Sequence, residues 1–291
     1  MLSSTGRYQG TLHSLTVNGQ TDTPDFRLTH FGNALRLSTR FHAQVDATNG
    51  DTHLQPVEAR LGQSPFTVQG QVVRVPGAMV AGVQRSVGHD IALVVDVDRA
   101  RIEDFLRLAS RELTPLLTGA LAMKTSLHIP PGTAPVHQRM ILDGRFTLEQ
   151  ARFTNAKVQS RIAELSLRGQ GRPQELKTTD PVSISLRMTS SFRLSSGIIT
   201  LPDLDYTVPG AKIQLKGAYV LEDEALNFAG TARMAAPISR MVGGWKGLLL
   251  SPIDRYFEKD GAGTEVPIRI EGTRAEPKFG IDFERMKPAR P

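Results

Sequence analysis

The chain has 291 residues, of which 40% are hydrophobic and 22% charged, so it is long enough to bury a sizeable core. It contains no cysteine, which excludes disulfides and cysteine-ligated metal sites. The net charge is +6, but the basic residues are thinly spread and aromatic residues make up only 6%. Because nucleic-acid tails need runs of basic residues and stacking surfaces need aromatic ones, nucleic acid is not an expected partner.

The start of the chain reads like the inside of a longer protein. No stretch approaches 18 consecutive apolar residues, and residues 1–10 lack the basic and apolar regions of a signal peptide. Tyr8, Gly10 and Leu12 instead alternate like a strand that needs partners on both sides. We therefore expect a fragment of a longer protein, with an unpaired sheet edge within residues 1–30 and the missing upstream part of its own chain as a partner.

Short alternating segments predict strands through the first third of the chain. Residues 7–97 predict a meander whose turns fall at 22–24, 49–51 and 62–65. Ile102, Phe105, Leu106 and Ala109 share one helical face and predict a helix over 99–109. Strand returns at 113–129.

The second half continues the same pattern around a second helix. A hairpin is predicted from strands at 138–148 and 151–154, and Asn155 is a candidate N-cap for a short helix to about Leu165. Turn-bounded strands then follow at 182–194, 197–208, 211–221 and 225–234, and a last hairpin at 265–271 and 278–283.

The longest helical pattern spans 237–258, and its apolar side includes Trp245, Leu248, Leu249, Tyr256 and Phe257. With its basic flanks, such a helix suits a membrane interface. The alternative is a helical cap that buries Trp245 and Leu249 on the open end of the sheet, and this is the interpretation we favour.

A glycine recurs in the apolar phase of one predicted strand after another, as in Phe66, Val68, Gly70 and Val72. Strand glycines serve sharp bends, bulges or close approach to the backbone. The pattern predicts a mainly β fold: an elongated, strongly curved antiparallel sheet, a groove or half-barrel, with two short helices and the helical cap. The groove residues that it predicts are Gly70, Gly119, Gly144, Gly217, Gly230, Phe66, Phe146 and Phe228. The alternative left open is that the glycines only let a large sheet coil and touch no ligand.

Catalytic signals are weak. The histidines have no short metal-ligand spacing, and neither a nucleophile elbow nor a phosphate-binding loop occurs. Two carboxylate pairs, Asp96 with Asp98 and Asp203 with Asp205, are compatible with a glycan-cleaving enzyme. Exposed strand faces explain both pairs equally well. We expect no enzyme activity, no cofactor and no metal, and rank the glycan enzyme last.

The C-terminal part of the chain contains WKGLLLSPID at 245–254, Phe257, GAGTEVPI at 261–268 and GTRAEPKFG at 272–280. Upstream it contains TPDF at 23–26, TNGDT at 48–52, RIED at 101–104 and FTN at 153–155. Together these stretches resemble the C-terminal end of AsmA-like bacterial proteins. The resemblance covers essentially all 291 residues. It implies a protein anchored in the inner membrane by an N-terminal helix, with its bulk in the periplasm. Relatives include bridge-like proteins whose curved sheet forms an apolar groove for phospholipid passage towards the outer membrane.

The resemblance implies no catalytic residues, and this sequence lacks both the anchor and the expected upstream strands. We expect residues 1–291 to form one AsmA-like β-rich domain, with 237–258 as a cap inside it. The expected function is a non-enzymatic envelope-biogenesis module that holds or passes phospholipid acyl chains between inner and outer membrane. Its expected partners are phospholipid and inner-membrane or periplasmic envelope proteins. The alternative is a structural periplasmic scaffold or assembly factor with no lipid cargo.

Overall fold

The computed structural model describes residues 2–28, 31–80, 83–110, 112–177, 184–236, 240 and 264–281. The chain divides into two compact units. Unit 1 comprises residues 1–115, 120–146 and 192–199, and unit 2 comprises residues 116–119, 147–191 and 200–291.

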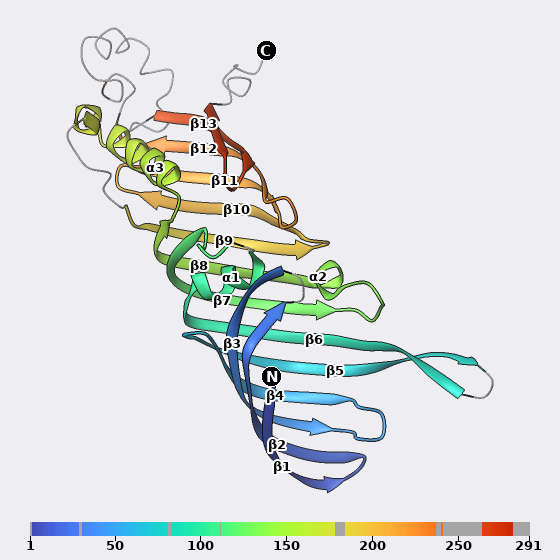
Figure 1. Ribbon diagram of the computed structural model, residues 1–291. Helices are drawn as coiled ribbons and strands as arrows, with labels where there is room; N and C mark the ends of the chain where they lie inside the picture. The colour runs from blue at the N-terminus through green and yellow to red at the C-terminus, as the bar shows by residue number, and fades with distance from the viewer. Residues whose placement is uncertain are drawn as a thin grey trace. The chain divides into compact units, whose positions relative to one another are not determined.

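The fold is mainly β, as expected, and its strands follow one another in the sheet in the order of the sequence (Figure 1). The paired neighbours are antiparallel, and β1 and β14 stand at the two ends of the order. The strands are β1 (Ser3–Thr11), β2 (Ser14–Leu28), β3 (Phe31–Val45), β4 (Thr52–Leu61), β5 (Ser64–Val80), β6 (Val83–Arg101), β7 (Leu117–Ile129), β8 (Ile141–Phe153), β9 (Leu186–Ser195), β10 (Ile198–Val208), β11 (Ala211–Val220), β12 (Ala225–Met234), β13 (Thr264–Thr273) and β14 (Pro277–Ile281). The described helices are α1 (Ile102–Ala109), α2 (Val136–Arg139), α3 (Ala156–Gly169) and the 3-10 helix η1 (Pro173–Lys177).

Strand register gives the sheet of unit 1 one apolar and one polar face. Residues directly opposite each other in a ladder share a face, because successive side chains alternate between faces. The register therefore places these residues on one side, called here the apolar face: Val17, Leu37, Phe41, Leu54, Val57, Phe66, Val68, Val72, Ile91, Leu93, Val95 and Leu127. The opposite side, the polar face, carries residues such as Arg40, Glu58, Thr67, Asp96 and Lys124.

In unit 2, helix α3 packs against β11, and the apolar strand face is buried at Ile213 and Ala232. The Asn155 side chain accepts hydrogen bonds from the backbone N–H groups of Lys157 and Val158, so the predicted N-cap is confirmed. Val158 and Ile162 of α3 are buried. Two side chains attach the helix to segments beside the strands: Gln159 Nε2 donates to the carbonyl of Ile184, just before β9, and Ser166 Oγ to that of Pro209, between β10 and β11.

Most predicted strands of the second half are confirmed, but one predicted turn there is wrong. The hairpin expected over 138–154 is a single strand, β8, preceded by α2. Leu148 and Ala151 are both buried although they lie three residues apart, and Gln150 takes a positive φ of 52° between them. One extra residue of this kind marks a bulge. In a sequence pattern, such a bulge looks like a turn.

The turn expected at 22–24 is also wrong, because these residues lie within β2. The register between β2 and β3 shifts between Thr23 and Phe26, so Pro24 falls in an irregular part of the ladder. Proline lacks an N–H donor and is tolerated in strands at bulges. The predicted helix over 237–258, with Trp245, Leu248, Leu249, Tyr256 and Phe257, lies outside the described residues apart from residue 240.

Candidate functional site

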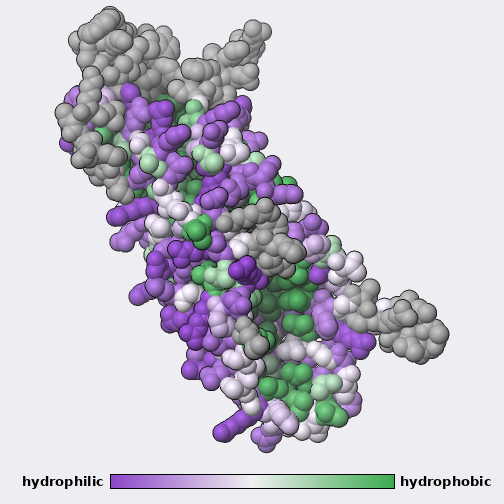
Figure 2. Space-filling model, viewed as in Figure 1, coloured by the Kyte–Doolittle hydropathy of each residue, from purple (hydrophilic) through white to green (hydrophobic). Residues whose placement is uncertain are grey.

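The candidate site is an apolar hollow of about 280 Å³ on the apolar face of unit 1, called here the trough. Figure 2 shows apolar residues gathered in a hollow over the strands of this unit, with hydrophilic residues along its sides. The trough is lined by Leu37, Thr39 and Phe41 of β3, Leu54, Val57 and Ala59 of β4, and Phe66 and Val68 of β5.

Side chains line the trough to different depths. Val57 and Ala59 are buried and form its floor. Leu37, Phe41, Phe66 and Val68 are only half-buried, although they are large and apolar. Their outer surfaces therefore stay available to an apolar ligand.

A bulge in β4 brings two trough residues onto the same face. The register with β5 shifts between Leu54 and Val57, which places Gln55 and Pro56 in the bulge. As a result Leu54 and Val57 both lie on the apolar face although they are three positions apart in the sequence. Sequence reasoning missed Leu37, Phe41, Leu54 and Val57, and Pro56 in an alternating segment is the signal that marks the interruption.

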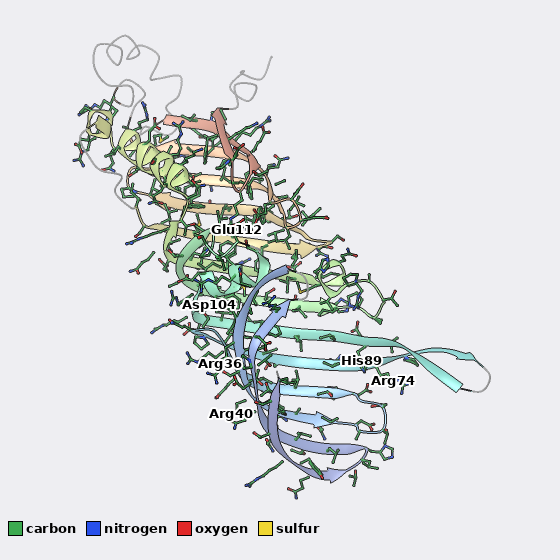
Figure 3. The ribbon with its side chains drawn as sticks, viewed as in Figure 1. Arg36, Arg40, Arg74, His89, Asp104 and Glu112 are labelled. Carbon is green, nitrogen blue, oxygen red and sulfur yellow. The ribbon has the colours of Figure 1, made fainter. Side chains whose placement is uncertain are left out.

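Helix α1 packs on the apolar face at one end of the trough. The ring of Phe105 meets that of Phe66 edge-on, with 5.9 Å between the ring centroids and 67° between the planes. The buried carboxylate of Asp104 accepts hydrogen bonds from Ser64 Oγ at 2.7 Å and from the backbone N–H of Gln63 at 3.1 Å. These bonds tie α1 to the turn between β4 and β5, and Figure 3 labels Asp104 there. The helix therefore forms an end wall.

The predicted groove residues are divided between the two units. Phe66, Gly70, Gly144 and Phe146 belong to unit 1, whereas Gly119, Gly217, Gly230 and Phe228 belong to unit 2. Of these residues Phe66 lines the trough. Phe146 contacts Phe192, with 6.1 Å between the ring centroids.

The backbone explains why glycine occupies these strand positions. Gly70 has a φ of +145°, and a Cβ atom on it would overlap the carbonyl oxygen of Ala92. In unit 2, Gly217 lies beneath the ring of Phe228 and against the carbonyl of Asn227. The glycines thus allow close approach of neighbouring strands.

The carboxylates considered for catalysis lie among polar partners. Asp96 faces Lys124 across the ladder, with 3.7 Å between the carboxylate and the ammonium group, and the side chain of Asp98 is 93% exposed. In unit 2, Asp203 accepts a hydrogen bond from the backbone N–H of Ser191 at 2.7 Å, and Asp205 accepts one from Gln214 at 2.9 Å. These contacts are typical of solvated strand faces.

A larger polar hollow of about 830 Å³ lies on strands β1 to β6 of unit 1. Opposite charges alternate along it: Arg36 pairs with Asp22 at 2.7 Å and Arg40 with Glu58 at 3.2 Å. The hydrogen bond from Arg36 lowers the pKa of Asp22 below its ordinary value. Because basic and acidic groups pair within it, this hollow shows no preference for one sign of ligand charge.

Among the described residues, no cluster of His, Cys, Asp and Glu suited to a metal ion occurs. In the same part of the chain, no helix combines the length and apolar character needed to cross a bilayer. No protein family, curated protein or solved structure matches this chain.

Proposed function

We propose that the chain is a non-enzymatic envelope-biogenesis module that holds phospholipid acyl chains in the trough of unit 1 and passes them between inner and outer membrane. The observation that carries this proposal is the trough itself, an apolar hollow lined by large side chains that are only half-buried. The resemblance to AsmA-like proteins adds the setting: the periplasm, an inner-membrane anchor upstream, and envelope proteins as partners.

The energetics suit a lipid tail. Each buried methylene contributes about 0.8 kcal/mol, so five methylenes covering the trough contribute about 4 kcal/mol. The same contact removes the outer surfaces of Phe41, Phe66 and Val68 from water. An alkyl chain also needs no hydrogen-bond donor or acceptor from these side chains.

The proposed groove requires a curved sheet, and the position of α1 supports this. The helix follows β6 directly, yet its Phe105 packs on Phe66 of β5 and its residues also contact β3, three strands away in the order. A sheet that bends around α1 accounts for these contacts. We propose that 237–258 caps the strands of unit 2.

A second candidate, a structural scaffold without lipid, is favoured by unit 2. There α3 packs on the strands, and Ile213 and Ala232 have no exposed surface. A face filled by the protein's own side chains leaves no room for a ligand.

Two neighbouring substitutions separate these functions. Val68→Glu places a charge in the trough, whereas Gln69→Glu places the same charge on the polar face one residue away. We expect the parent chain and Gln69→Glu to retain phospholipid after purification from bacterial cells, and Val68→Glu to lose it, as measured by native mass spectrometry. Circular dichroism checks that both variants fold. If Val68→Glu does not fold, the milder Val68→Thr replaces it in the same measurement. A parent chain without bound lipid would favour the scaffold.

A further inference from the structure

The apolar face of unit 1 ends at a pair of basic side chains. The β5–β6 ladder is regular from Thr67 to Val75, and Arg74 is directly opposite His89. Alternation of side chains therefore places Arg74 in line with Val72 and Gly70, and His89 in line with Ile91 and Leu93. Both residues follow the apolar face at the end away from α1.

Contacts on the other side of the two-stranded ribbon formed by β5 and β6 agree with this placement. Gly88 precedes His89 and so faces the opposite way, and a Cβ atom on Gly88 would lie 3.6 Å from Cβ of Pro131. The loop after β7 therefore adjoins the polar face of the ribbon. The ribbon also extends past both neighbouring strands here, because β4 pairs only as far as Val72 and β7 only as far as Ile91.

Arg74 and His89 are exposed, and Figure 3 labels both on this ribbon. Within the part of the chain that the structure describes, neither side chain has an ion-pair or hydrogen-bond partner. A carboxylate contacts Arg74 at its backbone: Asp51 Oδ1 accepts from the N–H of Arg74 at 2.6 Å, and Asp51 Oδ2 accepts from Asn49 Nδ2 at 3.0 Å. The guanidinium of Arg74 is thus available for an external anion.

We propose that Arg74 and His89 bind the phosphate group of a single-chain amphiphile whose acyl tail runs along the apolar face towards Phe66. Arginine matches phosphate with two parallel N–H donors, and a histidine ring N–H adds another donor. This inference rests on the proposed lipid-binding function and adds the charge of the ligand and its direction.

The dimensions agree with this ligand. Phe66 lies eight positions before Arg74, a distance along the strand of about 26 Å at about 3.3 Å per residue. One leaflet of a bilayer core is about 15 Å thick, half of about 30 Å. An acyl tail that starts at Arg74 therefore fits on the apolar face before the end wall at Phe105.

Three probes test the head-group site: oleoyl lysophosphatidic acid, oleoylglycerol with the same tail but no phosphate, and inorganic phosphate. Arg74→Gln and His89→Gln remove the pair, and Arg145→Gln removes an exposed arginine from the polar side of β8 as the matched control. We expect Arg74→Gln to weaken the lysophosphatidic acid at least about tenfold and to leave oleoylglycerol unchanged, by isothermal titration calorimetry. His89→Gln should act in the same direction, and Arg145→Gln should change neither ligand.

The outcomes separate this inference from the proposed function. If both oleoyl probes bind the parent chain equally well, or Arg74→Gln weakens both equally, the head-group site is wrong while the trough stands. If inorganic phosphate binds as tightly as the lysophosphatidic acid, the pair is an anion site without a tail and the inference fails. If neither oleoyl probe binds the parent chain, the proposed function itself fails.

The direction of the ligand can be measured because the chain has no cysteine. Thr52 lies opposite Val72 at the Arg74 end of the apolar face, and Thr39 lines the trough near Phe66. A fluorophore on Thr39→Cys should be quenched more strongly than one on Thr52→Cys by a lysophosphatidic acid with a nitroxide at the tail end. Stronger quenching at position 52 would overturn the proposed direction.

Discussion

Units 1 and 2 use the same alternating strands but differ in what covers the apolar face. In unit 2 the 14-residue helix α3 packs on the strands, and Ile213 and Ala232 are fully buried. In unit 1 the 8-residue helix α1 covers one end of the face, and Phe66 and Val68 beyond it are half-buried. The apolar face of unit 2 is therefore a packed core, whereas that of unit 1 is an open trough.

This difference shows that strand alternation and ligand binding are separate properties. Alternation decides which side chains share a face. What packs on that face decides how much of it stays open: α1 reaches the apolar face at Phe66, whereas Phe41 and Val68 remain half-buried. Asp104 holds α1 at the turn between β4 and β5, whereas Ser166 and Gln159 attach α3 to segments beside the strands.

The largest expected effect is on stability, from matched truncations in the two units. Ile213→Ala leaves a cavity in a packed core and should lower the free energy of unfolding by about 2–5 kcal/mol. Val68→Ala removes a half-buried side chain and should cost about 1 kcal/mol or less, while it weakens lipid binding. Urea unfolding measures both, and equal losses would contradict the distinction between core and trough.

A pair of glycine substitutions tests the second largest effect. Gly70→Ala forces a Cβ atom onto the carbonyl of Ala92 at a φ of +145° and should destabilise the chain by about 3 kcal/mol. Gly197 also has a positive φ, +74°, but no atom lies within 4 Å of its Cβ position. Gly197→Ala should therefore cost only about 1 kcal/mol. Thermal unfolding compares them, and a neutral Gly70→Ala would show that the close strand approach is not required.

Much of the fold could be predicted from the sequence, because alternation and turn residues are local signals. The strands predicted at 197–208, 211–221 and 225–234 match β10, β11 and β12, and the Asn155 cap is confirmed. Errors arose at bulges: Gln150 and Pro24 interrupt a ladder without ending the strand. Sequence signals for a bulge and a turn overlap, since both use proline and residues with positive φ.

The candidate site could be predicted only in part. Phe66 was named because it alternates with Val68 and Gly70, and it lines the trough. Leu54 and Val57 were missed because the bulge at Pro56 breaks the period. The basic pair was also missed, because only the β5–β6 register brings Arg74 opposite His89. No local signal separates the open face of unit 1 from the filled face of unit 2.

The end wall of the trough gives an intermediate effect. Asp104→Ala leaves the buried hydroxyl of Ser64 and the N–H of Gln63 without this acceptor and should cost about 1–3 kcal/mol. Because α1 is then less firmly held, the chain should also retain lipids with longer tails, as measured by mass spectrometry. The control Asp98→Ala changes an exposed carboxylate and should stay within about 0.5 kcal/mol of the parent. Loosened α1 without any change in bound tails would argue that it does not limit the trough.

The smallest expected effect is on alkaline stability, which should separate the units by their tyrosines. In unit 2, burial raises the pKa of Tyr206, and burial with the charge of Glu224 raises that of Tyr219 to about 12. A folded-state pKa above the unfolded value near 10 stabilises the fold below pH 10, and this contribution is lost as the pH rises towards 12. The loss between pH 10 and 11 is at most about 1.4 kcal/mol for the buried Tyr206. Urea unfolding should show a smaller alkaline loss in Tyr206→Phe than in the parent. The loss should be unchanged in Tyr8→Phe, because Tyr8 is 78% exposed in unit 1. An equal alkaline loss in both variants would mean that the buried face of unit 2 is not the source.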